Sequence, residues 1–93
     1  MQSIMKVKIR TKRIGKYRLN KIVSLVFEKR NYFKAGLFEW WACIEGRENG
    51  VKYPMGYGDT KIQARDEFVK DFEKNPHLVK DLIVEYETTN NKS

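Results

Sequence analysis

Lysine and arginine are the residues of this chain whose number and spacing could do chemistry, and they crowd its N-terminal third. Residues 1–34 contain eleven of them and one acid, Glu28, whereas residues 35–93 contain eight basic and eleven acidic residues. Such a local excess of positive charge attracts phosphate groups, so we expect nucleic acid, either RNA or DNA, as the partner. The candidate nucleic-acid-binding residues are Lys6, Lys8, Arg10, Lys12, Arg13, Lys16, Arg18, Arg30, Lys34, Lys61 and Arg65.

The first of these cations lie on an alternating pattern. In residues 6–12, basic side chains alternate with apolar or β-branched ones, which is typical of a strand packed on one face. Residues 16–19 resume the alternation after a break near Gly15, so the two segments predict a basic β-hairpin. Lysines on an edge strand also prevent aggregation, and this simpler explanation stays open, although the cations outnumber what edge protection requires.

A second set of candidates is acidic. Asp66, Glu67 and Asp71 are expected on the exposed side of a helix and could occupy a basic groove of another protein. The alternative function is therefore a small protein-binding regulator or inhibitor, antitoxin-like or encoded by a phage or mobile element, that docks on a nucleic-acid-processing protein. It could equally use the basic face for this, against an acidic groove or an exposed edge strand of the target. An exposed edge strand would also permit a homodimer.

Residues suited to catalysis or metal binding are scarce. The chain has one cysteine, Cys43, and one histidine, His77, which cannot form an internal disulfide and do not supply the ligands of a conventional zinc site. Cys43 lies in an apolar strand pattern without an activating base nearby in sequence, so we interpret it as a packed residue. We expect no enzymatic activity, no metal and no cofactor.

The helical candidates are positioned by a helix that is expected to begin at about Lys61. Thr60 can cap this helix, and Gln63 completes a capping box with it. Gly56 and Gly58 lie just ahead, where they allow a positive φ angle or a close approach of two backbones.

One face of this helix is apolar. Ala64, Phe68 and Phe72 recur at a spacing of four, and Val69 widens the stripe, which predicts one buried and one exposed face. Pro76 removes an amide donor and restrains the residue before it, so we expect the helix to end there.

Two further apolar segments predict strands. Residues 21–29 are rich in β-branched and aromatic side chains and favour a strand, with a helix as the competing interpretation. Residues 37–46 alternate so that Trp40 belongs to one face and Trp41 to the other. Because both faces are partly apolar, we expect a central strand with the helix on one side.

The rest of the chain is shorter elements. Asn49-Gly50 favours a hairpin turn, after which residues 51–53 are expected to pair back. Residues 77–80 read as a short turn. Residues 81–88 alternate apolar and acidic side chains and predict a final strand, with a second helix as the open alternative.

Together these elements predict an α+β fold. We expect a small antiparallel sheet, built from a hairpin, a strand and a second hairpin, followed by one amphipathic helix packed on one face and a final strand. Residues 1–88 form a single domain and residues 89–93 a polar tail. No apolar run approaches the roughly 18 residues of a membrane span, and the first residues lack the apolar stretch of a signal peptide, so we expect a cytoplasmic protein that does not bind membranes.

The start of the helix resembles a known family. Residues 56–65 read Gly-x-Gly-x-Thr-Lys-x-x-Ala-Arg, which resembles the loop and second-helix start of double-stranded RNA-binding domains. In that family a Gly-x-Gly-x-Ser-Lys-Lys-x-Ala-Lys run places cations at a helix N-terminus against phosphates, which implies this role for Lys61 and Arg65. Ile62 stands where the family has a second lysine, and the N-terminal helix of the family is not evident.

A second resemblance overlaps the first. Gly58-Asp59-Thr60 followed by Ala64 is similar to the Gly-Asp-Thr-x-x-x-Ala segment of HicB-type antitoxin domains, which implies a strand-rich, partial RNase H-like fold. The Pro-Asp-type loop and the C-terminal DNA-binding segment of that family are not evident. The same residues also make a well-capped turn from strand to helix with no specific function, and that interpretation stays open.

Overall fold

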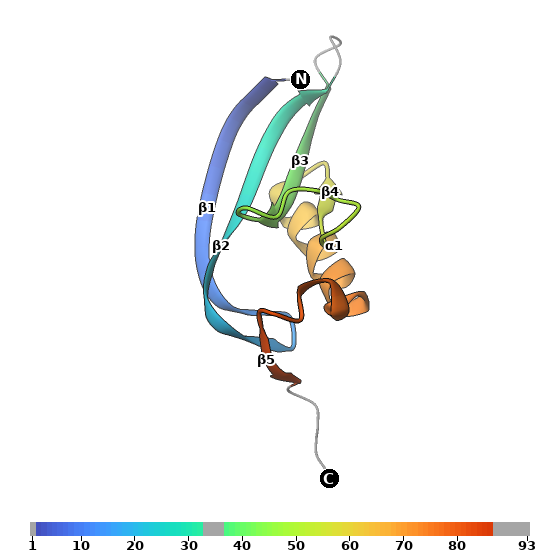
Figure 1. Cartoon of the computed structure of the whole chain (residues 1–93). Coiled ribbons are helices and arrows are strands. Elements are labelled where there is room, and N and C mark those ends of the chain that lie inside the picture. The colour runs from blue at the N-terminus through green and yellow to red at the C-terminus, as the bar shows by residue number, and fades with distance from the viewer. Residues whose placement is uncertain (1, 33–36, 87–93) are drawn as a thin grey trace.

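The computed structural model describes residues 2–32 and 37–86, which form an antiparallel sheet with one helix against it (Figure 1). This arrangement confirms the predicted α+β fold class. In chain order the elements are β1 (Gln2–Ile14), β2 (Tyr17–Tyr32), β3 (Leu37–Ile44), β4 (Gly56–Gly58), α1 (Lys61–Lys74), the short 3₁₀ helix η1 (Pro76–Val79) and β5 (Ile83–Tyr86). No helix in these two segments is long and apolar enough to cross a membrane.

β1 and β2 form one long, curved antiparallel hairpin (Figure 1). Its turn uses Gly15, whose φ of 58° suits a residue without a Cβ atom. Two separate strands were predicted over residues 16–19 and 21–29, but the structure has the single strand β2, and the helical alternative for residues 21–29 is wrong. The predicted break near Gly15 is the turn of this hairpin, and a register shift lies before it, between Thr11 and Arg13.

β3 is the predicted central strand, between β2 and β4. The predicted return strand at residues 51–53 is wrong, and β4 pairs with β3 instead. The reason is local: the carbonyl oxygen of Asn49 accepts from the amides of both Lys52 and Tyr53, and its side chain accepts from the amide of Val51. These bonds close residues 49–53 into a compact turn and occupy the amides of Val51, Lys52 and Tyr53, which a returning strand would use in its ladder.

α1 begins and ends where the sequence predicts. The amide of Gln63 donates to Thr60 Oγ1 at 3.0 Å, and Gln63 Oε1 accepts from the amide of Asp59 at 2.9 Å. The side chain therefore reaches one residue further back than in the usual capping box. At the other end the amide of Asn75 donates to the carbonyls of the last turn, and Pro76 follows.

The apolar stripe of α1 makes the centre of the core. Ala64, Phe68 and Phe72 are 0% exposed and pack against the inner sides of β2, β3 and β4. Gly56 is needed for this contact, because a Cβ atom there would lie 2.2 Å from backbone atoms of Ala64 and Phe68. Gly56 and Gly58 thus serve the close approach that the sequence predicted, while positive φ angles occur at Gly15 and Gly46.

β5 confirms the final strand and excludes the helical alternative for that segment. It pairs with the start of β2, with Arg18 opposite Glu85 and Leu19 opposite Ile83. The loop before it is fixed by Arg47, whose two terminal nitrogens contact the two carboxylate oxygens of Asp81 at 3.0 and 2.6 Å. The predicted residues 87 and 88 of this strand lie outside the described part of the chain.

Candidate nucleic-acid interface

The sheet has one side covered by α1 and one side that α1 leaves exposed, which we call the open face. Val7 and Phe27 are paired in the β1–β2 ladder and belong to the core on the helix side. Because side chains alternate along a strand, Lys6, Lys8 and Arg10 project to the open face. Successive members of this cation row stand about 6.8 Å apart along β1.

Two members of the cation row have an acidic residue nearby: Lys6 stands opposite Glu28 in the β1–β2 ladder, and Lys8 contacts a carboxylate directly. Lys8 Nζ contacts Glu45 Oε2 at 2.5 Å, and both side chains are about half exposed. This hydrogen bond and the charge of Lys8 lower the pKa of Glu45 below its ordinary value. Exposed ion pairs contribute little to stability, so Lys8 can exchange Glu45 for another anion at small cost.

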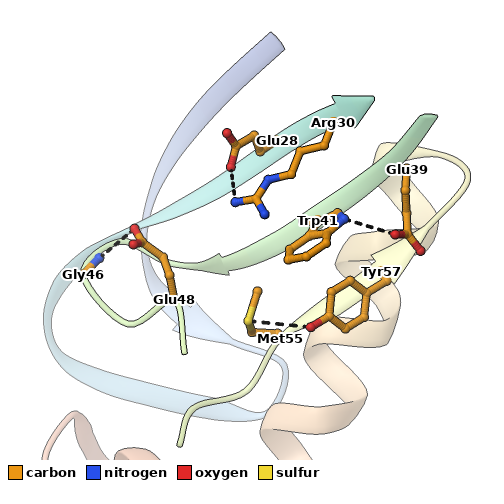
Figure 2. A network of polar contacts seen from close by, with 8 residues as sticks. All are labelled: Glu28, Arg30, Glu39, Trp41, Gly46, Glu48, Met55 and Tyr57. Carbon is orange, nitrogen blue, oxygen red and sulfur yellow. Dashed lines mark hydrogen bonds and ion pairs between the residues drawn. The ribbon is translucent and has the colours of Figure 1, made fainter. Parts of the chain in front are cut away.

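Aromatic side chains occupy the same face two strands away. Trp41 of β3 and Tyr57 of β4 meet edge to face with ring centroids 4.8 Å apart (Figure 2). The guanidinium of Arg30 lies 4.0 Å from the centre of the Trp41 ring and contacts Glu28 at 2.8 Å. Trp41 Nε1 donates to Glu39 Oε1 at 3.1 Å. We call Trp41 and Tyr57 the aromatic patch.

Cys43 lies beneath the aromatic patch. It is buried with Val26 and Met55, and Trp41 packs against this small cluster. Burial, followed by the charge of Glu48, raises the pKa of the thiol to about 11, so the thiol is protonated at neutral pH. This environment fits the prediction of a packed residue. The described residues contain no group of three His, Cys, Asp or Glu side chains that could hold a metal ion.

A second concentration of cations lies at the turn of the hairpin. Lys12, Arg13 and Arg18 line a hollow of about 440 Å³ together with Leu19 and Asn20. Arg13 and Arg18 stand opposite one another in the β1–β2 ladder, where like charges disfavour pairing. Lys16 lies in the turn itself. We call Lys12, Arg13, Lys16 and Arg18 the basic bend.

Two predicted cations belong to the helix. Lys61 and Arg65 lie in the first turns of α1, on the other side of the sheet from the cation row. Arg65 contacts Asp66 at 3.5 Å, and together with Arg13 it lines the hollow between the hairpin and α1. Lys34 lies outside the described residues. The structure therefore places the helical cations on a different side of the sheet from the cation row.

The acidic candidates do not form one anionic surface. Asp71 is half-buried, and its two carboxylate oxygens accept from the amide of Met55 at 3.1 Å and from Asn75 Nδ2 at 2.8 Å. Glu67 is exposed but contacts Lys70 at 3.4 Å, and Asp66 has Arg65 beside it. The exposed side of α1 carries both basic and acidic side chains, and Asp71 stabilises the fold through its hydrogen bonds.

The sequence reasoning did not include the aromatic patch among the site residues. The alternation of β3 already placed Trp41 on the side opposite Trp40, and only one helix was expected to cover the sheet. A large aromatic side chain on the uncovered side was therefore a usable signal for Trp41. Tyr57 gave no such signal, because its strand was predicted elsewhere.

Comparison of the chain with models of protein families, with curated protein sequences and with solved structures found no match. The resemblances of residues 56–65 to double-stranded RNA-binding domains and to HicB-type antitoxin domains therefore stay predictions.

Proposed function

We propose that this protein is a non-enzymatic module that binds single-stranded nucleic acid across the open face. Phosphates lie along the cation row and continue to the basic bend. The observation that carries the proposal is the β1–β2 register, which aligns Lys6, Lys8 and Arg10 on one uncovered side of a strand. Strand β1 and the first part of β2 lead directly from this row to Arg13 and Arg18.

Phosphate contacts supply the affinity in this proposal. Each lysine or arginine that neutralises a phosphate releases a condensed counterion, so binding weakens steeply as salt rises. In the part of the chain that the structure describes, no recognition helix or zinc finger offers base-specific contacts. Binding through the backbone of the nucleic acid therefore tolerates different base sequences.

The aromatic patch favours a single strand over a duplex. Neighbouring strands are about 4.8 Å apart, so Trp41 and Tyr57 lie about 10 and 14 Å from β1 across the sheet. Tyr57 is 42% exposed and offers its ring to solvent. An unpaired base that turns inward from a backbone on β1 can stack there, which is how single-strand binders combine cations with aromatic rings.

The glutamates of the open face weaken the attraction between its cations and phosphate groups. Glu45 contacts Lys8 and Glu28 contacts Arg30, so an incoming phosphate competes with carboxylates for these cations. This competition lowers the affinity for any anion that fails to engage several cations together. The arrangement favours a polymer over single phosphates.

The test is fluorescence anisotropy with labelled single- and double-stranded RNA and DNA at about 50 and about 200 mM salt. The variant replaces Lys6, Lys8 and Arg10 with glutamine. It should weaken single-strand binding about tenfold or more and reduce the slope of log affinity against log salt by about 2.

A matched control replaces Lys61, Arg65 and Lys70 with glutamine, which removes the same charge from α1. These three side chains are exposed, so the fold should tolerate the change. We expect this control to keep most of the affinity. Equal losses in the two triple variants would contradict the proposal, because they would reduce binding to general attraction between a basic protein and a polyanion.

A further inference from the structure

We infer that the outer edge of β1 receives an extended segment of a partner protein whose residues alternate between apolar and acidic. Among the described strands, β1 pairs with β2 alone, so no described strand covers its other edge. Residues 5–11 pair with β2 in unbroken register between two shifts, a length of about 23 Å. An edge of this length presents a row of backbone donors and acceptors to an added strand.

The helix side of this edge is apolar and uncovered. Met5 is 50% exposed and Ile9 is 45% exposed, although both lie on the same side of β1 as the core residue Val7. α1 packs mainly on β3 and β4, and it leaves β1 standing away from the helix (Figure 1).

A groove separates the two elements. It has a volume of about 730 Å³, with Ile9, Leu25 and Phe27 contributed by the sheet and Val69 by α1. Charged side chains of α1, Arg65, Asp66, Glu67 and Lys70, also line it. Apolar side chains of an added strand would extend this surface beside Ile9. Burying apolar area in this way is the main favourable term in such an association.

The open side of the same edge is cationic. Lys6, Lys8 and Arg10 alternate with Met5, Val7 and Ile9 along the strand. Every second side chain of an added strand therefore lies beside the cations, and the side chains between them lie beside the apolar surface. Opposite charges on neighbouring strands stabilise pairing, so the complementary sequence places acids on its open side and apolar residues on its helix side.

The cations also disfavour a second copy of this chain as the occupant. Antiparallel pairing of two β1 edges in one continuous sheet brings the cation rows of both copies onto the same face. Like charges on neighbouring strands destabilise pairing, and here six would gather. The edge therefore selects an acidic partner of a different sequence.

The probe is a labelled synthetic peptide of eight residues that alternates glutamate and valine. The comparison peptide has the same composition with four glutamates followed by four valines, so the charge is equal and the alternation is lost. By fluorescence anisotropy the alternating peptide should bind about tenfold more tightly. Hydrogen exchange should slow at those β1 amides that point away from β2. Equal binding of the two peptides, or protection confined to other residues, would overturn the inference.

Two variants locate the apolar contact. Ile9→Ser should weaken binding of the alternating peptide about fivefold, while Ile22→Ser, which truncates a similarly exposed isoleucine of β2, should change it less than twofold. Circular dichroism checks that both variants are folded. Equal effects of the two substitutions would contradict docking beside Ile9.

The nucleic-acid proposal and this inference fail separately. Ile9→Ser removes no charge and should leave oligonucleotide binding unchanged. Absence of peptide binding by the unmodified protein, with oligonucleotide binding present, would reject only the edge inference. Absence of oligonucleotide binding, with the preference for the alternating peptide present, would reject only the nucleic-acid proposal. If an oligonucleotide slows hydrogen exchange at the β1 amides that point away from β2 and the peptide does not, the edge inference is also rejected.

Discussion

The helix side and the open face of the sheet use the same strands for opposite purposes. Trp40 and Trp41 are adjacent in β3, yet Trp40 packs against the main core while Trp41 lies on the open face between Arg30 and Tyr57. The helix side is filled by apolar side chains that approach closely. The open face carries half-exposed rings and like charges in a row, which contribute little to stability. Changes on the first side should therefore test folding, and changes on the second should test binding.

The largest expected effect is the loss of a core phenylalanine. Phe68 is fully buried at the centre of the helix side, so Phe68→Ala should lower the free energy of unfolding by about 3–5 kcal/mol. A domain of this size has only about 5–15 kcal/mol in total. Denaturant unfolding followed by circular dichroism measures the change. A loss below about 1 kcal/mol would mean that the helix side is not the stabilising one.

A second prediction for the core concerns a close contact between two backbones rather than the creation of a cavity. Gly56→Ala places a methyl group against the backbone of α1, so we expect a loss of about 3 kcal/mol in unfolding free energy. Gly50→Ala is the matched control, because the nearest atom to its added methyl group is the Met55 sulfur at 3.1 Å, which can move. If thermal denaturation shows both variants equally destabilised, close packing of β4 on α1 is not the cause.

Substitutions on the open face should change nucleic-acid binding. Tyr57→Ala removes the exposed ring that is proposed to stack on a base, and such stacking contributes about 1–3 kcal/mol per base. The affinity for single-stranded oligonucleotide should fall accordingly, while duplex binding should change less. Anisotropy titrations with both forms measure the difference. An equal loss for both would place Tyr57 outside the stacking site.

A smaller effect on stability comes from Asp81. Its hydrogen bonds with Arg47 hold the pKa of the carboxyl below the ordinary value of 3.8, so the stabilisation exists above that pH and disappears as the pH falls further. Because the Asp81 side chain is 60% exposed, Asp81→Asn should cost below about 1 kcal/mol at pH 7. Unfolding measured at pH 7 and near pH 2.5 should show a larger gap between variant and parent at the higher pH.

The smallest expected effect sharpens the role of the cation row. Glu45→Gln removes the carboxylate that competes for Lys8, so single-strand binding should strengthen about twofold at low salt. Glu67→Gln, which removes an exposed acid from α1, is the control and should change binding less. Weaker binding by the Glu45 variant would show that the ion pair positions Lys8 for its ligand.

Sequence reasoning succeeded where the physics is local. Thr60 and Gln63 lie three residues apart and cap one helix end, so their pattern is sufficient to place the start of α1. The alternation of β3 similarly fixes which side of the strand each tryptophan faces. These features depend on neighbours in the sequence and require no knowledge of the rest of the fold.

Sequence reasoning failed where register and long-range pairing decide. Nothing local in Val51 and Tyr53 shows that Asn49 will hold them in a turn, so β4 was placed too early in the chain. The position of Lys61 and Arg65 relative to the cation row could not be predicted for a related reason, because the side of the sheet covered by α1 depends on tertiary packing. The aromatic patch depends on pairing between β3 and β4 and was therefore missed.

The burial of Cys43 makes the rate of thiol labelling a measure of local opening in the protein. Cys43 is 7% exposed and packs in one cluster with Met55 and Trp41, and its thiol stays protonated at neutral pH, so a thiol-specific reagent reacts only when this part of the open face opens. As the chain has one cysteine, the rate of labelling reports the opening of a single place. A ligand bound to the aromatic patch would slow the labelling of Cys43, whereas a ligand bound only to the outer edge of β1 would leave the labelling rate unchanged.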